Sequence, residues 1–209
     1  MTQHYMDLAT LVDPAHTTVL TMEMERGVVG DLARFTGPAE AARESGMIDR
    51  VAEVCAAARG ADMRVVHCIA AFRPDKAGSY RNMPAILPFM DDPEHLPIGT
   101  PATEVVPELR ADDDLESVRL HGIAPFVGTS LDPILRSLGT RTIIATGVSL
   151  NRGITGMTIE AVDHGYHVVI PTDAVAGYPA EYGKLVLEHT LKNIATLTTV
   201  AELTSLWSS

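Results

Sequence analysis

The chain is poor in the residues that mark several common classes of protein. Its 209 residues include two cysteines, Cys55 and Cys68, and aromatic residues make up 5% of the sequence. No C-x-x-C, H-x-H or H-x-x-x-H spacing occurs, so the pattern favours neither a zinc site nor another metal centre. We therefore expect no metal and no cofactor, and two reduced thiols packed in the core.

Basic residues and long apolar runs are also scarce. Sixteen Lys and Arg oppose 27 Asp and Glu, giving a net charge of -11. Scattered basic residues argue against nucleic acid or an anionic membrane as a partner. No window approaches the roughly 18 apolar residues of a spanning helix, and the opening MTQHYMDLATLVDP lacks the features of a secretory signal. We expect a cytoplasmic protein that binds a small molecule.

Apolar runs alternate with amphipathic stretches along the whole chain. We expect strands over residues 17–24, 63–70, 116–120, 142–148, 167–171 and 194–199. Helices are expected between them, over residues 46–59, 129–138, 153–164, 179–193 and 201–206. This alternation predicts parallel βαβ units, so the fold class is α/β. We expect one Rossmann-like three-layer domain over residues 1–209, with a mostly parallel sheet of about six strands and helices on both faces.

Two charged residues end predicted strands. Glu23 follows an apolar run, where a partly desolvated carboxylate suits general acid/base catalysis; the alternative is a solvated carboxylate or a cap. Arg119 offers a fixed fork for a carboxylate or carbonyl oxygen; the alternative is a surface ion pair. His121, two residues later, is a candidate substrate contact or an ordinary loop histidine. Phe126, further along this loop, is also a candidate substrate contact.

A tight turn, GVSLNRG at residues 147–153, joins a buried strand to a helix. Its backbone N–H groups point toward the helix start, where such groups polarise a carbonyl or hold an anion. Ser149 and Asn151 are candidates for hydrogen bonds to a substrate, although either residue also suits a helix cap. The turn lacks G-x-G-x-x-G and a P-loop lysine, so it does not indicate a phosphate-binding loop.

The arrangement GVSLNRGI…EAVDHGYHVVIPTDAVAG resembles the signature of the isochorismatase-like (cysteine hydrolase) family. The resemblance extends from VLTMEMERGVV to ATLTTVAEL, nearly the whole chain. It matches the family's aspartate to Glu23 and its nucleophilic cysteine to Gly153. The family's lysine falls at Arg119 or, on the spacing to Phe126, at Leu120.

The resemblance also implies features beyond these three positions. The family's cis peptide would fall at Val148-Ser149, and the metal ligands of its nicotinamidase branch have no clear counterpart in AFRPDKAGSY. Family members commonly form dimers or tetramers, so we expect a homo-oligomer. The apolar stretch AILPFM, residues 85–90, is either an interface patch or packed within the same chain.

Glycine at position 153 removes the thiolate on which covalent catalysis depends. The first hypothesis is a hydrolase of a small amide, carbamoyl or enol-ether metabolite that uses Glu23 as a general acid/base. Glu23, Arg119 and Gly153 are then its catalytic positions. The second is a non-catalytic family member that keeps the pocket for binding or assembly.

Overall fold

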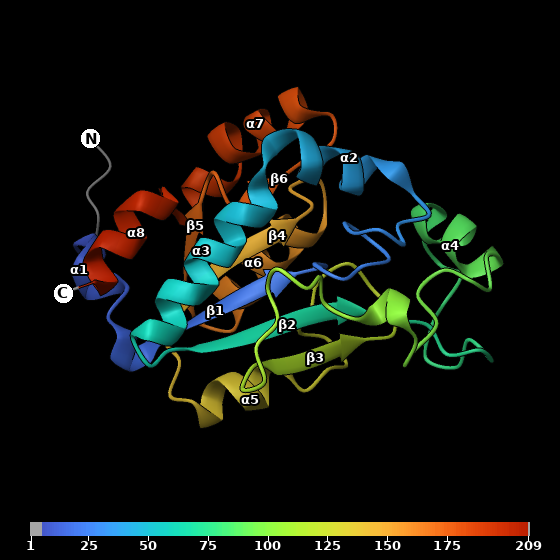
Figure 1. Ribbon diagram of the computed structural model, residues 1–209, viewed down its shortest axis with the longest axis horizontal. Helices are drawn as coiled ribbons and strands as arrows, with labels where there is room; N and C mark the ends of the chain where they lie inside the picture. Colours follow the sequence, from blue (N-terminus) through green and yellow to red (C-terminus); the bar gives the residue numbers. More distant parts are fainter. Residues whose placement is uncertain (1–5, 209) are drawn as a thin grey trace.

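A single, mostly parallel sheet forms the centre of the molecule, with helices on both of its faces (Figure 1). The computed structural model describes residues 6–208. The strand order is β3-β2-β1-β4-β5-β7, with β6 paired to β4, and every one of these pairs is parallel. The strands are β1 Thr17–Met22, β2 Arg64–Ala70, β3 Leu115–Arg119, β4 Thr142–Val148, β5 His167–Pro171, β6 Val175–Ala176 and β7 Thr196–Thr198.

The predicted α/β fold is confirmed, and the structure adds four short or weakly patterned elements. Three are short: β6, α1 Leu8–Leu11 and α4 Leu87–Asp91. The fourth, α2 Thr36–Ser45, buries only Ala42 and therefore lacks the apolar stripe that reveals a helix in sequence. The other helices are α3 Met47–Gly60, α5 Leu131–Ser137, α6 Gly153–Asp163, α7 Ala180–His189 and α8 Val200–Trp207. None of the helices in residues 6–208 has the length and apolar character needed to cross a membrane.

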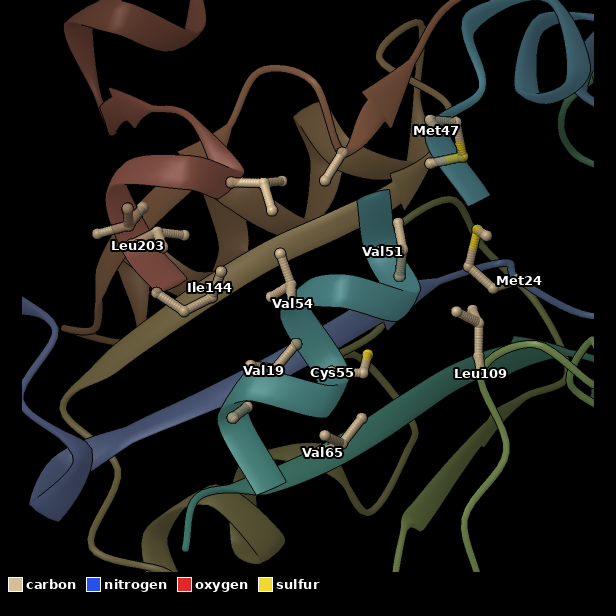
Figure 2. Close-up of a cluster of buried hydrophobic side chains, with 14 of the residues drawn as sticks. Val19, Met24, Met47, Val51, Val54, Cys55, Val65, Leu109, Ile144 and Leu203 are labelled. Carbon is tan, nitrogen blue, oxygen red and sulfur yellow. The ribbon is translucent and has the colours of Figure 1, made fainter. Parts of the chain in front are cut away.

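Alternate residues along each strand face opposite layers, as the twofold period of a strand requires. Figure 2 shows one layer, in which Val54 and Cys55 of α3 lie over Val19 of β1 and Val65 of β2. α8 covers the same face and adds Leu203 to this layer. The neighbouring strand residues belong to the other layer, with side chains from α5, α6 and α7: Leu20, Val66, Ile143, Leu135, Met157 and Val186.

Both cysteines belong to these core layers. Cys55 in α3 and Cys68 in β2 are buried and unpaired. Burial raises the pKa of each thiol to about 12, because the thiolate would lose its hydration. Both side chains therefore pack as small apolar groups, as the sequence predicts.

A chain of buried polar groups joins β1, β2 and the loop before β3. The Thr21 hydroxyl lies 2.7 Å from His67 Nδ1, and His67 Nε2 lies 3.0 Å from an oxygen of Asp114. Arg59 donates to both oxygens of that carboxylate, at 3.0 and 2.6 Å. The order of groups resembles a hydrolytic triad, but none of them lines the pocket described below. In this position, the linked hydrogen bonds satisfy the polar groups of these four side chains within the fold.

The carboxyl ends of β1, β2, β3 and β4 meet at one edge of the sheet, because these strands are parallel. The segment between β2 and β3 covers this edge, and α4 lies within it at the right of Figure 1. β1 ends at Met22, two residues earlier than the sequence pattern predicts, and Glu23 is the first residue beyond it. The fold therefore collects the residues that follow four strands in one place.

Candidate active site

A pocket of about 110 Å³ opens at this carboxyl edge. The segment after β2 and the loop after β1 supply a mostly apolar wall, and the strand ends supply the polar residues. The wall includes Val28, Phe35, Phe72, Met83, Ile86, Phe89 and Leu96. The polar and charged side chains that line the pocket are Glu23, His95, Arg119, His121, Ser149 and Arg152. An apolar enclosure with a few convergent polar groups is typical of a small-molecule site.

Glu23 and Arg119 form an ion pair at the strand ends. Arg119 Nη2 donates to Glu23 Oε1, and the two side chains are 7% and 22% exposed, respectively. Their strands, β3 and β1, are not neighbours but lie on either side of β2, about 10 Å apart. The pair therefore crosses above β2, a span that two long side chains can bridge.

The backbone holds Glu23 in place. Its φ is +53°, in the left-handed region, and its N–H donates to the carbonyl of Cys68 at 2.9 Å. A non-glycine residue in this region has a conformational cost, and such residues are found most often at functional sites. The turn directs the carboxylate across β2 toward Arg119.

Glu25 is a second carboxyl group next to this pair, and the sequence analysis did not single it out. It is fully buried; Oε1 accepts from the Ala70 N–H at 2.9 Å, and Oε2 has no partner among the described residues. Burial, with the nearby charge of Glu23, raises the pKa of Glu25 to about 8. Glu25 is therefore mostly protonated at neutral pH. The repeat of Glu at positions 23 and 25 was the only signal of it in the sequence.

The turn between β4 and α6 forms another side of the pocket. The Val148-Ser149 peptide is cis, at the position that the family resemblance implies. Ser149 and Gly153 both line the pocket. The carbonyl of Ser149 accepts from the N–H groups of Arg152 and Ile154, whereas the Gly153 N–H has no acceptor in residues 6–208. Unpaired N–H groups in the first turn of a helix are ready donors to a ligand.

Position 153 has little room for a side chain. A Cβ built on Gly153 would lie 2.9 Å from the carbonyl oxygen of Val148 and 3.2 Å from Cγ and Cε of Met22. The first of these neighbours is backbone and cannot rotate away. A cysteine here would therefore require the turn and Met22 to shift, which gives a packing reason for glycine at this position.

The structure brings five of the seven predicted site residues to the pocket: Glu23, Arg119, His121, Ser149 and Gly153. The other two are elsewhere. Phe126 is buried in the core, where its ring stacks on His164 with centroids 5.0 Å apart. Asn151 bonds to the backbone N–H and carbonyl of Tyr178 and so braces the loop before α7. Neither Phe126 nor Asn151 lines the pocket.

An aromatic cluster forms part of the pocket wall around His95. Its ring stacks on Phe89 at 4.8 Å and meets the edge of Phe35 at 5.0 Å. Burial lowers the pKa of His95 to about 4, so the ring is neutral at physiological pH.

No group of three or more His, Cys, Asp or Glu within residues 6–208 is arranged to hold a metal ion.

The apolar stretch over residues 85–90 contributes to the same wall. Ile86 and Met90 are buried against Phe72 and Leu96. Of the two interpretations of this stretch, an interface patch or packing within the same chain, these two residues therefore follow the second. Its two buried residues are therefore not available to a partner surface.

A parallel α/β domain with a pocket at the carboxyl edge belongs to the large class of α/β enzyme folds. Residues 17–202 match the family description "Isochorismatase domain", and the chain belongs to the isochorismatase family of hydrolases. The uncharacterized isochorismatase family protein YwoC of Bacillus subtilis is 31% identical over 121 residues. These residues are 56% of this chain and 64% of YwoC, so the match spans less than two thirds of that relative.

Solved structures show the same fold over almost the whole chain. A cysteine hydrolase from Pseudomonas syringae superposes with a TM-score of 0.82 at 22% identity, covering 100% of this chain and 99% of its own. An N-carbamoylsarcosine amidase from Thermoplasma acidophilum gives a TM-score of 0.67 at 23% identity, covering 88% and 96%. At these identities the similarity concerns the fold.

Proposed function

We propose that this protein hydrolyses a small metabolite with an amide, carbamoyl or enol-ether bond, without a cysteine nucleophile. Glu23 is the general acid/base of the proposed reaction. The observation that carries the proposal is the Glu23 carboxylate, fixed by Arg119 inside an apolar pocket that Gly153, whose N–H is unpaired within residues 6–208, also lines. Neither cysteine lines that pocket.

Glu23 supplies the carboxyl group that is suited to proton transfer in the pocket. Arg119 carries a guanidinium, which donates hydrogen bonds but does not act as a general acid or base. Glu25 is not a lining residue, and Glu23 is the one carboxyl group among the described residues that line the pocket. Arg119 then acts as a positioning residue that holds the Glu23 carboxylate toward the substrate.

For an amide or carbamoyl substrate, a water molecule adds to the carbonyl carbon in the proposed reaction. Glu23 takes one proton from that water and later returns it to the leaving nitrogen, so the products are an acid and an amine. The Gly153 N–H donates to the carbonyl oxygen as negative charge develops on it. No bond forms between substrate and protein.

For an enol ether, the same carboxyl group acts first as an acid. Glu23 protonates the carbon of the double bond, water adds to the resulting oxocarbenium ion, and the proton of that water returns to Glu23, which leaves a hemiketal. The hemiketal then collapses: its hydroxyl loses a proton, the C–O bond breaks, and the leaving oxygen takes up a proton. The sum is addition of one water and cleavage of the C–O bond to a carbonyl compound and an alcohol. Both routes use Glu23 as the general acid/base and Arg119 to position it. Glu23 begins as a carboxylate in the amide route and as a carboxylic acid in the enol-ether route.

The pocket limits the size of the substrate. Its volume of about 110 Å³ is below the roughly 150 Å³ of an engineered cavity that binds benzene. The enclosed part of a substrate is therefore no larger than a six-membered ring. The name of the N-carbamoylsarcosine amidase supports including carbamoyl compounds among the bond classes, since that enzyme has the same fold.

The second candidate function is binding without turnover. It is favoured by Gly153, where the family resemblance places a nucleophile and where Met22 and Val148 leave little space. Such a protein would keep the pocket and bind the same class of small molecule. Self-association and a cytoplasmic location remain predictions under either function.

Turnover by the purified protein separates the two functions. The panel contains carboxamides, carbamoyl compounds, small lactams and enol ethers, assayed with the wild type, Glu23→Gln and Glu44→Gln. Glu44 is an exposed carboxylate of α2 and provides the matched control. Turnover that falls at least about 100-fold in Glu23→Gln and is retained in Glu44→Gln supports the hydrolase. Equal rates in all three proteins refute the role of Glu23, and absence of turnover with retained ligand binding supports the second function.

A further inference from the structure

We propose that Arg152 binds a carboxylate on the substrate and thereby makes the pocket selective for acidic small molecules over their neutral isosteres. The proposal rests on the proposed function in one respect, that the pocket is the substrate site. It adds the chemical class of the substrate and a specificity-determining residue. Arg152 precedes α6 and lines the pocket with an exposed side chain.

Arg152 is left unpaired by the described part of the chain, unlike most other arginines. Nine other arginines lie within 4.0 Å of a carboxylate oxygen: Arg26, Arg34, Arg50, Arg59, Arg73, Arg81, Arg110, Arg119 and Arg136. The side chain of Arg152 makes no ion pair and no hydrogen bond with any residue from 6 to 208. In a chain with 27 acidic residues, the pocket therefore retains a guanidinium that the fold itself does not neutralise.

The charge balance of the pocket also favours an anionic ligand. The ion pair between Glu23 and Arg119 sums to zero. Glu25 and His95 are mostly neutral near pH 7, because burial raises the pKa of Glu25 to about 8 and lowers that of His95 to about 4. Arg152 then leaves the lining with a positive charge, opposite in sign to the net charge of -11 on the whole chain. A local positive field inside an acidic protein favours an anionic ligand.

The backbone beside Arg152 adds to the positive potential on this side of the pocket. α6 begins at Gly153 and runs for 11 residues, so its positive end lies at the pocket. The Gly153 N–H is unpaired within the described residues and lies next to the arginine in sequence. The guanidinium and the helix terminus therefore attract negative charge to the same side of the pocket. The charge of Arg119 is already balanced by Glu23, which Nη2 contacts, although Nη1 has no partner among the described residues.

Binding of matched acid and amide pairs tests the proposal without any turnover. Benzoate is compared with benzamide, and isobutyrate with isobutyramide, by calorimetric titration at pH 7 and low ionic strength. The proteins are the wild type, Arg152→Gln and Arg141→Gln. Arg141 is an exposed arginine just before β4, at the opposite edge of the sheet, and also lacks a carboxylate partner, so its variant makes the same change of charge.

The wild type and Arg141→Gln are expected to bind the acid of at least one pair about tenfold more tightly than its amide, the scale of one charge-assisted hydrogen bond. Arg152→Gln should bind the two members of that pair equally. Equal binding of acid and amide by the wild type, failure to bind any of the four compounds, or an unchanged preference in Arg152→Gln would overturn the proposal. Acid binding that depends on Arg152, in a protein without hydrolytic turnover, would refute the hydrolase function while leaving this inference intact.

Discussion

Replacing Glu25 by glutamine should change how the stability of the fold depends on pH. Because the pKa of Glu25 rises from 4.5 to about 8 on folding, the folded state binds this proton more tightly than the unfolded chain. The stabilising contribution of the protonated form is complete below pH 4.5 and is lost as the pH rises to about 8. At about 1.36 kcal/mol per pKa unit, the full loss is roughly 5 kcal/mol.

Glutamine keeps the shape of this side chain and cannot ionise. Its amide oxygen can still accept from the Ala70 N–H, whereas its NH₂ would replace Oε2, which has no partner. The unpaired amide donor costs about 1–3 kcal/mol at every pH. We therefore expect Glu25→Gln to be slightly less stable than the wild type at pH 5.5, and more stable than the wild type by roughly 2–4 kcal/mol at pH 9.

Urea unfolding at pH 5.5 and pH 9 measures this directly, with Glu44→Gln as the control for loss of an exposed carboxylate. Between the two pH values, the stability of Glu25→Gln relative to the wild type should rise by about 3 kcal/mol, since only the wild type ionises at this position. Glu44→Gln should track the wild type within about 0.5 kcal/mol. A relative change below about 1 kcal/mol in Glu25→Gln would refute the reasoning that burial holds this carboxyl neutral.

Three further outcomes follow from the packing. A maleimide should leave both thiols unmodified in the native protein, by mass spectrometry, and label them in urea; labelling in the native state would contradict their burial. Gly153→Ala should lose about 1–3 kcal/mol in urea unfolding because its Cβ meets a backbone oxygen, whereas Gly60→Ala, with open space around it, should not; equal stabilities would refute the packing argument. Asp114→Asn should lose about 3 kcal/mol, because Arg59 and His67 lose their shared carboxylate; a loss below about 0.5 kcal/mol would show that this carboxylate adds little.

The regular part of the fold could be predicted from the sequence because it depends on local patterns. The strands predicted over residues 142–148 and 167–171 have the same bounds in the structure. Each is mostly apolar, as is typical of a strand buried on both faces, and each is flanked by residues that end it. α2 and β6 were missed because the first has almost no apolar face and the second has two residues.

The candidate site was predicted only in part. Glu23 and Arg119 were identifiable because each ends a predicted strand, and parallel strands bring their carboxyl ends together. Phe126 and Asn151 lie outside the pocket, since their side chains contact the core and a neighbouring loop. Which way a loop side chain turns depends on contacts with residues far along the chain, and a single sequence does not contain those contacts.

The sequence by itself determined the α/β class, the parallel sheet and the edge at which a site would form, because hydrophobic period and element order are local properties. Only the tertiary structure decided that the ion pair between Glu23 and Arg119 crosses above β2. It also decided that Glu25 is buried and mostly neutral, and that Arg152 lines the pocket with no partner among residues 6–208. The physical reason is that charge and burial depend on distances between residues that are far apart along the chain and that the fold places in contact, such as Glu23 and Arg119, which are 96 positions apart.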